Sequence, residues 1–341
     1  MIVVKKQACL LIVWAALFSV LLAMPAGAEE WKDRWKFGTI APDGIGWAKQ
    51  IKNIVIPAVE EATQGTLEVK VYWGGVMGDD EDFVSKMRIG QLQGAGWSGQ
   101  GVLIAVPEME VVTLPFLFNN YDEVDYIKQE MSEEFDEIAK KNGYMCIAWI
   151  DEDICSIYST KYDMSKLQDY KDAKILSWFG DVEERLYKSL GASPISVNMP
   201  EAPPALRQGV GDAITASAAW ILGTQLYSSI KYVSPYKLRY APAMIAVDWK
   251  TWSSMPEPYK EHYYKIRADV VKRFVAGVRS DNIKSLEAMK EYGLKEMPVS
   301  PEEMEAIRKN AVTIWQESLD SPDTGELLEE LLEHLEDFRA K

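Results

Sequence analysis

The segment 174–218 constrains the fold most, because short apolar runs alternate there with amphipathic stretches. Lys174–Ser177 and residues 194–197 have the length and composition of short strands. Residues 181–190 between them show the helical spacing of apolar positions. Residues 200–208 carry prolines near their start, which fit a first helical turn, where the missing N–H would have no partner. Strands that alternate with helices in this way predict an α/β fold.

The same alternation continues from residue 34 to residue 248 and predicts largely parallel sheets. Residues 46–62 are expected to form a helix that bends at Pro57, and residues 121–141 one continuous helix. Beyond residue 248 the pattern is helical, and residues 256–292 contain few helix breakers. We therefore expect an unusually long helix there, followed by shorter helices up to the C-terminus.

The first 28 residues have the composition of a leader rather than of a folded segment. Two lysines precede an apolar run that ends near Met24, and Ala-Gly-Ala at residues 26–28 forms a small-residue cleavage site. This pattern predicts a cleavable signal peptide at 1–28 and a mature chain exported to the periplasm. A membrane anchor is the alternative. No later stretch is long and apolar enough to cross a bilayer, so we expect no direct membrane insertion of the mature chain.

A formal net charge of −15 over 341 residues argues against a nucleic-acid partner, because phosphate contacts need clustered lysines and arginines. The length and the apolar content predict two lobes rather than one. No catalytic motif occurs, and with only two histidines in the chain neither a metal site nor a cofactor is indicated. The acidic run at residues 151–153 is interpreted as a turn between strands. These features favour a binding protein over an enzyme.

Cys146 and Cys155 are separated by a segment that has the composition of extended chain. Each extended residue adds about 3.3 Å, so the two sulfur atoms would lie too far apart to bond. A disulfide between them is the alternative, since an exported protein meets an oxidising compartment.

Several phrases of the sequence occur together in one family of binding proteins. They are KFGT at 36–39, MGDD at 77–80, TLPF at 113–116, GASP at 191–194 and VGDA at 210–213. In these phrases and in their order along nearly the whole mature chain, the sequence resembles the solute-binding proteins of tripartite ATP-independent periplasmic (TRAP) transporters, the DctP-like family. The resemblance implies a small-molecule ligand, and the membrane subunits of a TRAP transporter as partners.

The resemblance also implies a two-lobe periplasmic binding protein fold of the Venus flytrap type, with strands crossing between the lobes and a long helix spanning both. The first lobe would comprise residues 29–150 with a return segment at about 240–255, and the second lobe residues 151–239. Residues 256–341 would hold the long helix and the C-terminal helices.

In this family the first strand of the second lobe normally ends in an arginine that grips a substrate carboxylate, and Leu176 holds that place here. Ligands of α/β folds bind where strands end, so the residues that follow each predicted strand are candidate ligand-binding residues. They are Ile40, Trp73, Trp97, Leu176, Trp178, Met199, Ala216 and Trp220. Nearly all of these positions carry polar or charged groups in the family. Their apolar character here predicts an apolar or aromatic ligand and weak binding of small dicarboxylates.

The sequence leaves two alternatives open. A relocated cation, Arg185 or Arg239, would restore an acidic ligand if it reached the cleft. Alternatively, the chain is a periplasmic binding module that serves a sensor or hands on lipid-like cargo.

Overall fold

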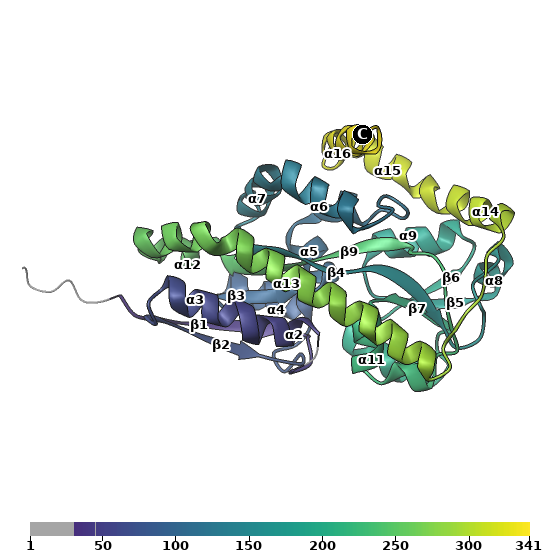
Figure 1. Cartoon of the computed structure of the whole chain (residues 1–341), viewed down its shortest axis with the longest axis horizontal. Coiled ribbons are helices and arrows are strands. Elements are labelled where there is room, and N and C mark those ends of the chain that lie inside the picture. Colours follow the sequence, from purple (N-terminus) through teal and green to yellow (C-terminus); the bar gives the residue numbers. More distant parts are fainter. Residues whose placement is uncertain (1–30, 45) are drawn as a thin grey trace, which may run out of the picture. The chain divides into compact units, whose positions relative to one another are not determined.

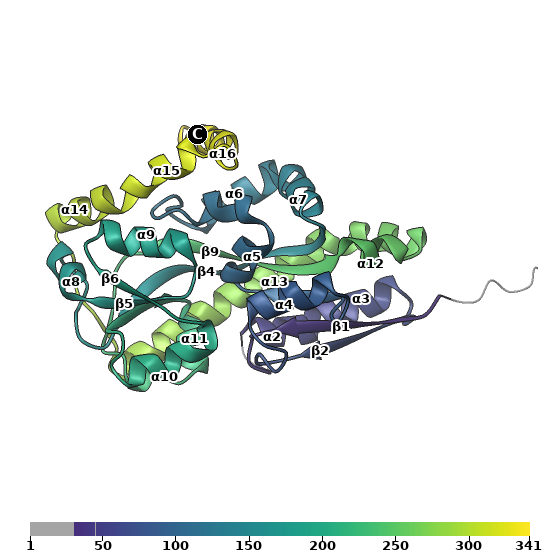
Figure 2. The same ribbon diagram turned by 180° about the vertical axis from the view of Figure 1, so that it is seen from behind.

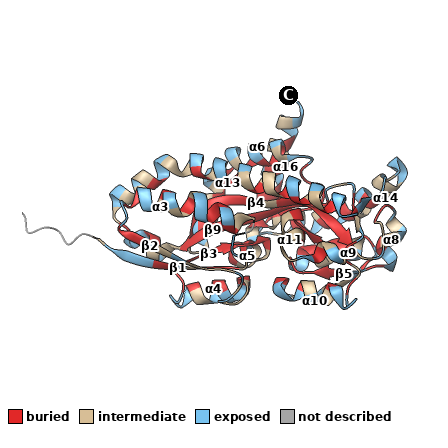
Figure 3. Ribbon diagram, turned by 60° about the horizontal axis from the view of Figure 1, so that its bottom comes forward, coloured by how far each residue is buried: buried red, intermediate tan, exposed pale blue. Residues whose placement is uncertain are grey.

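Two long antiparallel strands, β4 (Tyr144–Ser159) and β9 (Arg239–Asp248), pair side by side and join the two halves of the sheet (Figure 1). Every residue of β4 except Glu152 is buried, which explains its almost continuous apolar sequence. Figure 3 shows the same burial along both strands. Cys146 and Cys155 lie in β4 as free, buried thiols, which confirms that the segment between them is extended.

The structure is a computed structural model that describes residues 31–44 and 46–341. The predicted signal peptide at 1–28 lies outside the described residues. Across the described part of the chain, no helix combines the length and the apolar character that crossing a membrane requires. Residues 34–341 pack as one unit.

The strands follow one another in the order β2-β1-β3-β9-β4-β7-β5-β6. The first lobe holds the strands on one side of the crossing pair, β1 (Asp33–Thr39), β2 (Leu67–Tyr72) and β3 (Gly94–Trp97). The second lobe holds those on the other side, β5 (Lys174–Ser177), β6 (Ser193–Ser196) and β7 (Ala213–Ala216). Two short strands, β8 (Tyr232–Val233) and β10 (Lys295–Glu296), pair beside the second lobe.

The sheet is mixed rather than largely parallel. The pairs β1–β3, β5–β6 and β5–β7 are parallel, as expected. The pairs β3–β9, β9–β4 and β4–β7 are antiparallel. One crossing strand leaves the first lobe and the other returns to it, so the two run in opposite directions, and the parallel expectation was wrong at the middle of the sheet.

Helices cover the strands of each lobe, turning a buried face inward and an exposed face outward (Figure 3). In the first lobe they are α2 (Trp47–Gln50), α3 (Ile56–Ala62), α4 (Asp80–Arg88), α5 (Gly99–Ala105), α6 (Tyr121–Glu130) and α7 (Ser132–Lys141). In the second they are α8 (Leu167–Asp172), α9 (Asp181–Ser189), α10 (Ala202–Arg207) and α11 (Ala218–Gly223), seen from behind in Figure 2. The chain then forms α12 (Trp249–Ser254), α13 (Glu257–Glu291), α14 (Pro301–Ala311), α15 (Trp315–Asp320) and α16 (Gly325–Arg339).

The long helix α13 lies along β4 and contacts α11 of the second lobe and α2 and α3 of the first (Figure 1). This confirms the two-lobe α/β fold with a long helix that spans both lobes. The residue limits of the lobes, near 150 and 240, stay a proposal.

One stretch of α13, from Gly277 to Asn282, carries contacts to both lobes. A Cβ at Gly277 would fall 2.6 Å from the end of the Gln50 side chain, so a larger residue there would displace the amide of Gln50, which donates to Asp281 of α13. The amide of Asn282 donates to a backbone carbonyl of β4 at 2.8 Å and accepts the N–H of Ala219, in α11, at 2.9 Å. α13 is therefore fastened to the first lobe, the crossing strand and the second lobe within about one and a half turns.

Two predicted helices are interrupted. The helix over residues 46–62 contains a π-helical segment, η1 (Ile51–Val55), just before Pro57. Proline has no N–H for the α-helical ladder, and the wider turn next to it accommodates this. A bend at Pro57 itself stays a prediction. The helix over residues 121–141 was wrongly expected to be continuous: it breaks at Met131, whose φ of −100° and ψ of 16° are not helical. Met131 is buried there, which anchors the corner between α6 and α7.

The acidic run at residues 151–153 lies inside β4 and not in a turn, which corrects the sequence interpretation. The carboxylate of Asp151 accepts hydrogen bonds from Lys128 at 3.1 Å, Arg279 at 2.7 Å and Tyr240 at 2.7 Å. Burial alone would raise the pKa of Asp151, but the charges of Lys128 and Arg279 hold it below its usual value. A buried carboxylate is therefore tolerated in this strand because it pairs with Lys128 of α6 and Arg279 of α13.

We predict that Asp151→Asn lowers the free energy of unfolding by about 3 kcal/mol at pH 7, since it leaves Lys128 and Arg279 without their shared partner. The folded pKa lies below the usual 3.8, so this contribution is present above about pH 4 and is lost as the pH falls through the folded pKa. Urea denaturation at several pH values measures both effects. The control Asp269→Asn removes an exposed acid of α13 that pairs with Arg273 of the same helix. It should lower the free energy of unfolding by less than about 0.5 kcal/mol. Equal losses in the two variants would contradict the prediction.

Candidate ligand-binding site

A cavity opens where β1 ends in the first lobe and α11 begins in the second. Its volume is about 570 Å³, including its opening to solvent. The crossing strand β4 and the helix α13 complete its wall. The side chains that matter below are Ile40 and Trp47 of the first lobe, Glu152 of β4, Ser217 and Trp220 of the second lobe, and Asn282 of α13.

Local structure fixes the second-lobe wall of this cavity. Ser217 follows β7 and caps α11, because its side chain accepts the N–H of Trp220 at 3.4 Å. The side-chain oxygen Oδ1 of Asn282 accepts the backbone N–H of Ala219, in the first turn of the same helix, at 2.9 Å. The start of α11 therefore holds Trp220 at a set position on the cavity wall.

Glu152 is the acid of β4 that lacks a salt bridge among the described residues. Its carboxyl group accepts one long hydrogen bond, from the backbone N–H of Gly99 at 3.4 Å. Burial raises the pKa of Glu152 to about 8, against the opposing effect of Arg239. Burial likewise raises the pKa of Asp80 to about 7, although Ser98 hydrogen-bonds to it. Both acids therefore hold a proton more readily than an exposed carboxyl group.

Arg239 lies at the start of β9 and is buried. Its Nη2 donates to Glu183 at 2.8 Å, and its guanidinium lies 3.6 Å from the ring centre of Phe179. Its Nε and Nη1 have no hydrogen-bond partner among the described residues. Burial alone would lower the pKa of Arg239, but the carboxylate of Glu183 raises it, so the charge is retained. Glu183 also accepts the backbone N–H groups of Trp178 and Phe179 at 2.9 and 3.1 Å.

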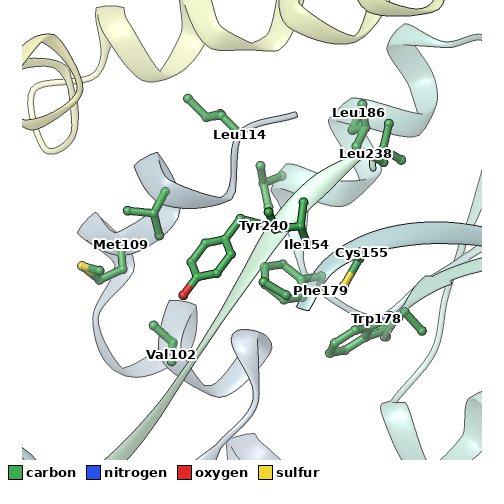
Figure 4. Packing of buried hydrophobic residues seen from close by; sticks show 14 of the residues in the cluster. Val102, Met109, Leu114, Ile154, Cys155, Trp178, Phe179, Leu186, Leu238 and Tyr240 are labelled. Atoms are coloured by element: carbon green, nitrogen blue, oxygen red, sulfur yellow. The ribbon is translucent and has the colours of Figure 1, made fainter. Parts of the chain in front are cut away.

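Phe179 closes a seam between the two lobes. It follows β5 of the second lobe, and its ring lies 5.2 Å from that of Trp178, between ring centres, within the buried cluster that Figure 4 draws. A Cβ on Gly99, the first residue of α5, would fall 1.9 Å from Cε2 of Phe179. Glycine at this position therefore lets the first lobe come into contact with the ring that covers Arg239.

The structure places two of the eight predicted ligand-binding residues, Ile40 and Trp220, on the cavity wall. Trp73 lies near Lys52 instead, with the ammonium 5.2 Å from its ring centre. The remaining five residues are buried; they are Trp97, Leu176, Trp178, Met199 and Ala216. Contact of these six residues with a ligand stays a prediction.

Three of the buried residues have identifiable neighbours within their own lobe. Trp97 packs edge-on against Tyr144 at 4.8 Å between ring centres, and its indole N–H has no partner among the described residues. The indole of Trp178 donates to the carbonyl of Thr215 at 2.8 Å. Leu176 packs directly against Gly211: a Cβ added to Gly211 would fall 2.6 Å from the side chain of Leu176.

The sequence reasoning missed Trp47, Glu152 and Asn282, which line the cavity. Trp47 and Asn282 belong to helices, whereas the search followed strand ends. Glu152 was missed because the sequence interpretation places residues 151–153 in a turn, whereas they lie in β4. Neither candidate cation is among the cavity residues. Arg185 pairs with Glu110 and Glu317, whereas the charge of Arg239 acts on Glu152 of the cavity wall.

A model of the bacterial extracellular solute-binding proteins, family 7 (DctP), matches residues 37–321. The chain belongs to this family. It is therefore a TRAP-type solute-binding protein and not an enzyme: it binds a small solute outside the cytoplasm and works with membrane subunits.

Relatives of the family 7 protein are distant in sequence. A solute-binding protein of Chromohalobacter salexigens is 25% identical over 280 residues, 80% of this chain and 83% of that one. The C4-dicarboxylate-binding periplasmic protein DctP of Rhodobacter capsulatus is 24% identical over 325 residues, 94% and 93% of the two chains. The sugar acid binding protein DctPAm of Advenella mimigardefordensis, solved with galactonate, shares the fold with a TM-score of 0.83 at 22% identity, over 90% of this chain and 98% of that one.

We predict that Gly99→Ala keeps the lobes of this family 7 protein apart, because the added methyl group would collide with Phe179. Small-angle scattering should then give a larger radius of gyration than for the parent protein. The second change Phe179→Leu, made in the same chain, removes the colliding ring edge and should restore the parent value. An unchanged scattering curve for Gly99→Ala would show that the seam does not hold the lobes together.

Proposed function

We propose that this chain is the receptor of a TRAP-type transporter for a small organic acid with an apolar or aromatic body. Arg239 supplies the cation that is absent at Leu176. The observation that carries the proposal is a buried guanidinium with two nitrogen atoms, Nε and Nη1, that have no partner among the described residues. Such unmet donors are costly in a folded protein and suggest a missing acceptor.

The surroundings of Arg239 favour an incoming carboxylate. A guanidinium has five N–H donors, and Glu183 accepts one hydrogen bond from Arg239, at 2.8 Å. Burial raises the pKa values of Asp80 and Glu152 to about 7 and about 8, so these acids repel an anion less than ionised carboxylates would. Separation of the lobes at the Gly99–Phe179 seam would uncover the guanidinium from the side of the first lobe.

The cavity favours an apolar body for this acid. Ile40 and the indoles of Trp47 and Trp220 line it, and burial of apolar surface stabilises a complex by about 25 cal/mol per Å². No lysine or arginine is among the cavity residues, so a second carboxylate would meet no cation there. This is consistent with weak binding of small dicarboxylates. A ligand with no carboxylate at all is the competing possibility.

Other members of the fold bind acids. Besides the galactonate complex, a TRAP solute-binding protein of Sulfurospirillum deleyianum was solved with succinate, with a TM-score of 0.79 at 20% identity. The relative in Rhodobacter capsulatus is a C4-dicarboxylate-binding protein. These likenesses support an acid as the ligand class of this chain, with a different source of positive charge.

We predict that calorimetry over a panel of aliphatic, aromatic and sugar monocarboxylates identifies at least one ligand, and that Arg239→Met weakens its binding by about thirtyfold or more. Arg239→Lys should weaken binding less, because it keeps the charge and loses the planar fork. Thermal unfolding checks that both variants fold.

The matched control is Arg185→Met, the same change at a cation that pairs with Glu110 and Glu317, which should leave affinity within about twofold of the parent value. Equal binding by the parent and Arg239→Met would refute the role of Arg239. Tight binding of uncharged aromatic compounds, with no acid bound, would favour the ligand without a carboxylate.

A further inference from the structure

We propose that the acid taken up here also carries a positively charged group, and that Glu152 with the indoles of Trp47 and Trp220 recognises it. The ligand class is then a zwitterion, such as an amino acid or a betaine. This inference rests on the proposed function, because Arg239 holds the carboxylate end of the same molecule.

The first observation is the unmatched carboxyl group of Glu152. Its neighbours in β4 both have strong partners: Asp151 binds Lys128 and Arg279, and Asp153 accepts the hydroxyl of Tyr121 at 2.6 Å. Glu152 has only the N–H of Gly99 at 3.4 Å, although it is mostly removed from solvent and lines the cavity. A carboxylate in this setting is stable only if a donor or a cation comes to it.

The second observation is the charge of the cavity wall. Its ionisable side chains are Asp151 and Glu152, and its remaining polar side chains, Ser217 and Asn282, are neutral. Asp151 is already matched, so Glu152 supplies the unmatched negative charge once it is ionised. A cationic group of a ligand complements this wall, and a second anionic group does not.

The third observation is the pair of indoles that line the cavity together with Glu152. Trp47 belongs to α2 and Trp220 to α11, and both are half-buried with part of their surface in the cavity. The faces of Trp73, Trp178 and Trp249 already carry cations of the protein, namely Lys52, Arg239 and Lys140. Among the contacts of the described residues, Trp47 and Trp220 have no such partner. An indole face attracts an ammonium group, most strongly where water is excluded.

Ligand binding should also move a proton. The groups that face Glu152 are Asp80 of α4, Asp153 of β4, Arg239 of β9 and the N–H of Gly99 of α5. In their company the pKa of Glu152 is raised to about 8, so at pH 7 most molecules carry the proton there. An ammonium group favours the ionised form, and Glu152 then releases its proton to the buffer. Binding of the zwitterion should strengthen as the pH rises toward 8.

The test compares acids that differ only in the positive charge. Phenylalanine is paired with 3-phenylpropionate, and glycine betaine with its isostere 3,3-dimethylbutyrate. Every compound keeps the carboxylate; the charged member of each pair is the one with the ammonium group, and the neutral member is the one without it. In the parent protein we expect the charged member of at least one pair to bind about tenfold tighter or more. Calorimetry in two buffers of different ionisation enthalpy should show proton release for that member only.

Variants separate the contributions. Glu152→Gln, which keeps the shape of the side chain, should remove the preference for the charged member, because it weakens binding of that member far more than binding of the neutral one. Trp220→Leu should weaken binding of the charged member more than that of the neutral one. The control Trp249→Leu alters an indole outside the cavity and should change neither.

Two results would overturn the inference while leaving acid binding intact. They are equal affinity for the two members of both pairs, and equal weakening of both members by Glu152→Gln. Failure of the proposed function has a different signature: neither these acids nor the wider panel of monocarboxylates binds the parent protein, or Arg239→Met binds them unchanged.

Discussion

The fold depends on the antiparallel ladder between β4 and β9. It pairs residues from Tyr144↔Asp248 to Cys155↔Arg239, with irregularities between Cys146 and Ala148 and between Asp151 and Asp153, and so connects one lobe to the other. The two charged groups to which we assign ligand binding lie on these strands: Arg239 pairs with Cys155 at one end of the ladder, and Glu152 lies at the irregularity between Asp151 and Asp153. The lobes bring apolar walls to the site, whereas the charged groups sit on the element that joins the lobes.

The sequence predicted the layered α/β class, the long helix and the second-lobe strands because those features are periodic and local. It did not predict that the acids at 151–153 lie within a strand. Local preference places carboxylates in turns, but Asp151 is satisfied by Lys128, which lies 23 residues away, and by Arg279, which lies 128 residues away. No window of sequence contains both partners, so the interaction that overrides the local preference is invisible at that scale.

Part of the site was predictable for a related reason. The end of a strand indicates a loop at the correct edge of the sheet, which located Ile40 and Trp220. It does not say on which side of the sheet a side chain lies, and Leu176 and Trp178 pack inside their own lobe in this structure. Trp47 and Asn282 reach the cavity from helices, where tertiary packing determines which face points inward. The importance of Arg239 was left open because only the packing of Phe179 and Glu183 around it reveals its unused donors.

The contacts of α13 between Gly277 and Asn282 place a pivot between the lobes. The arm on the Glu257 side is held to the first lobe, because Tyr263 donates to the carbonyl of Ile147 and Arg267 pairs with Asp136, so it moves with that lobe relative to the second. The arm that runs back from residue 279 to Glu257 is roughly 33 Å long at about 1.5 Å per residue. A lobe rotation of about 10° that is transmitted at the pivot would therefore move the end of that arm by about 6 Å. A small rotation between the lobes at the solute therefore becomes a larger displacement of the far end of α13 relative to the second lobe.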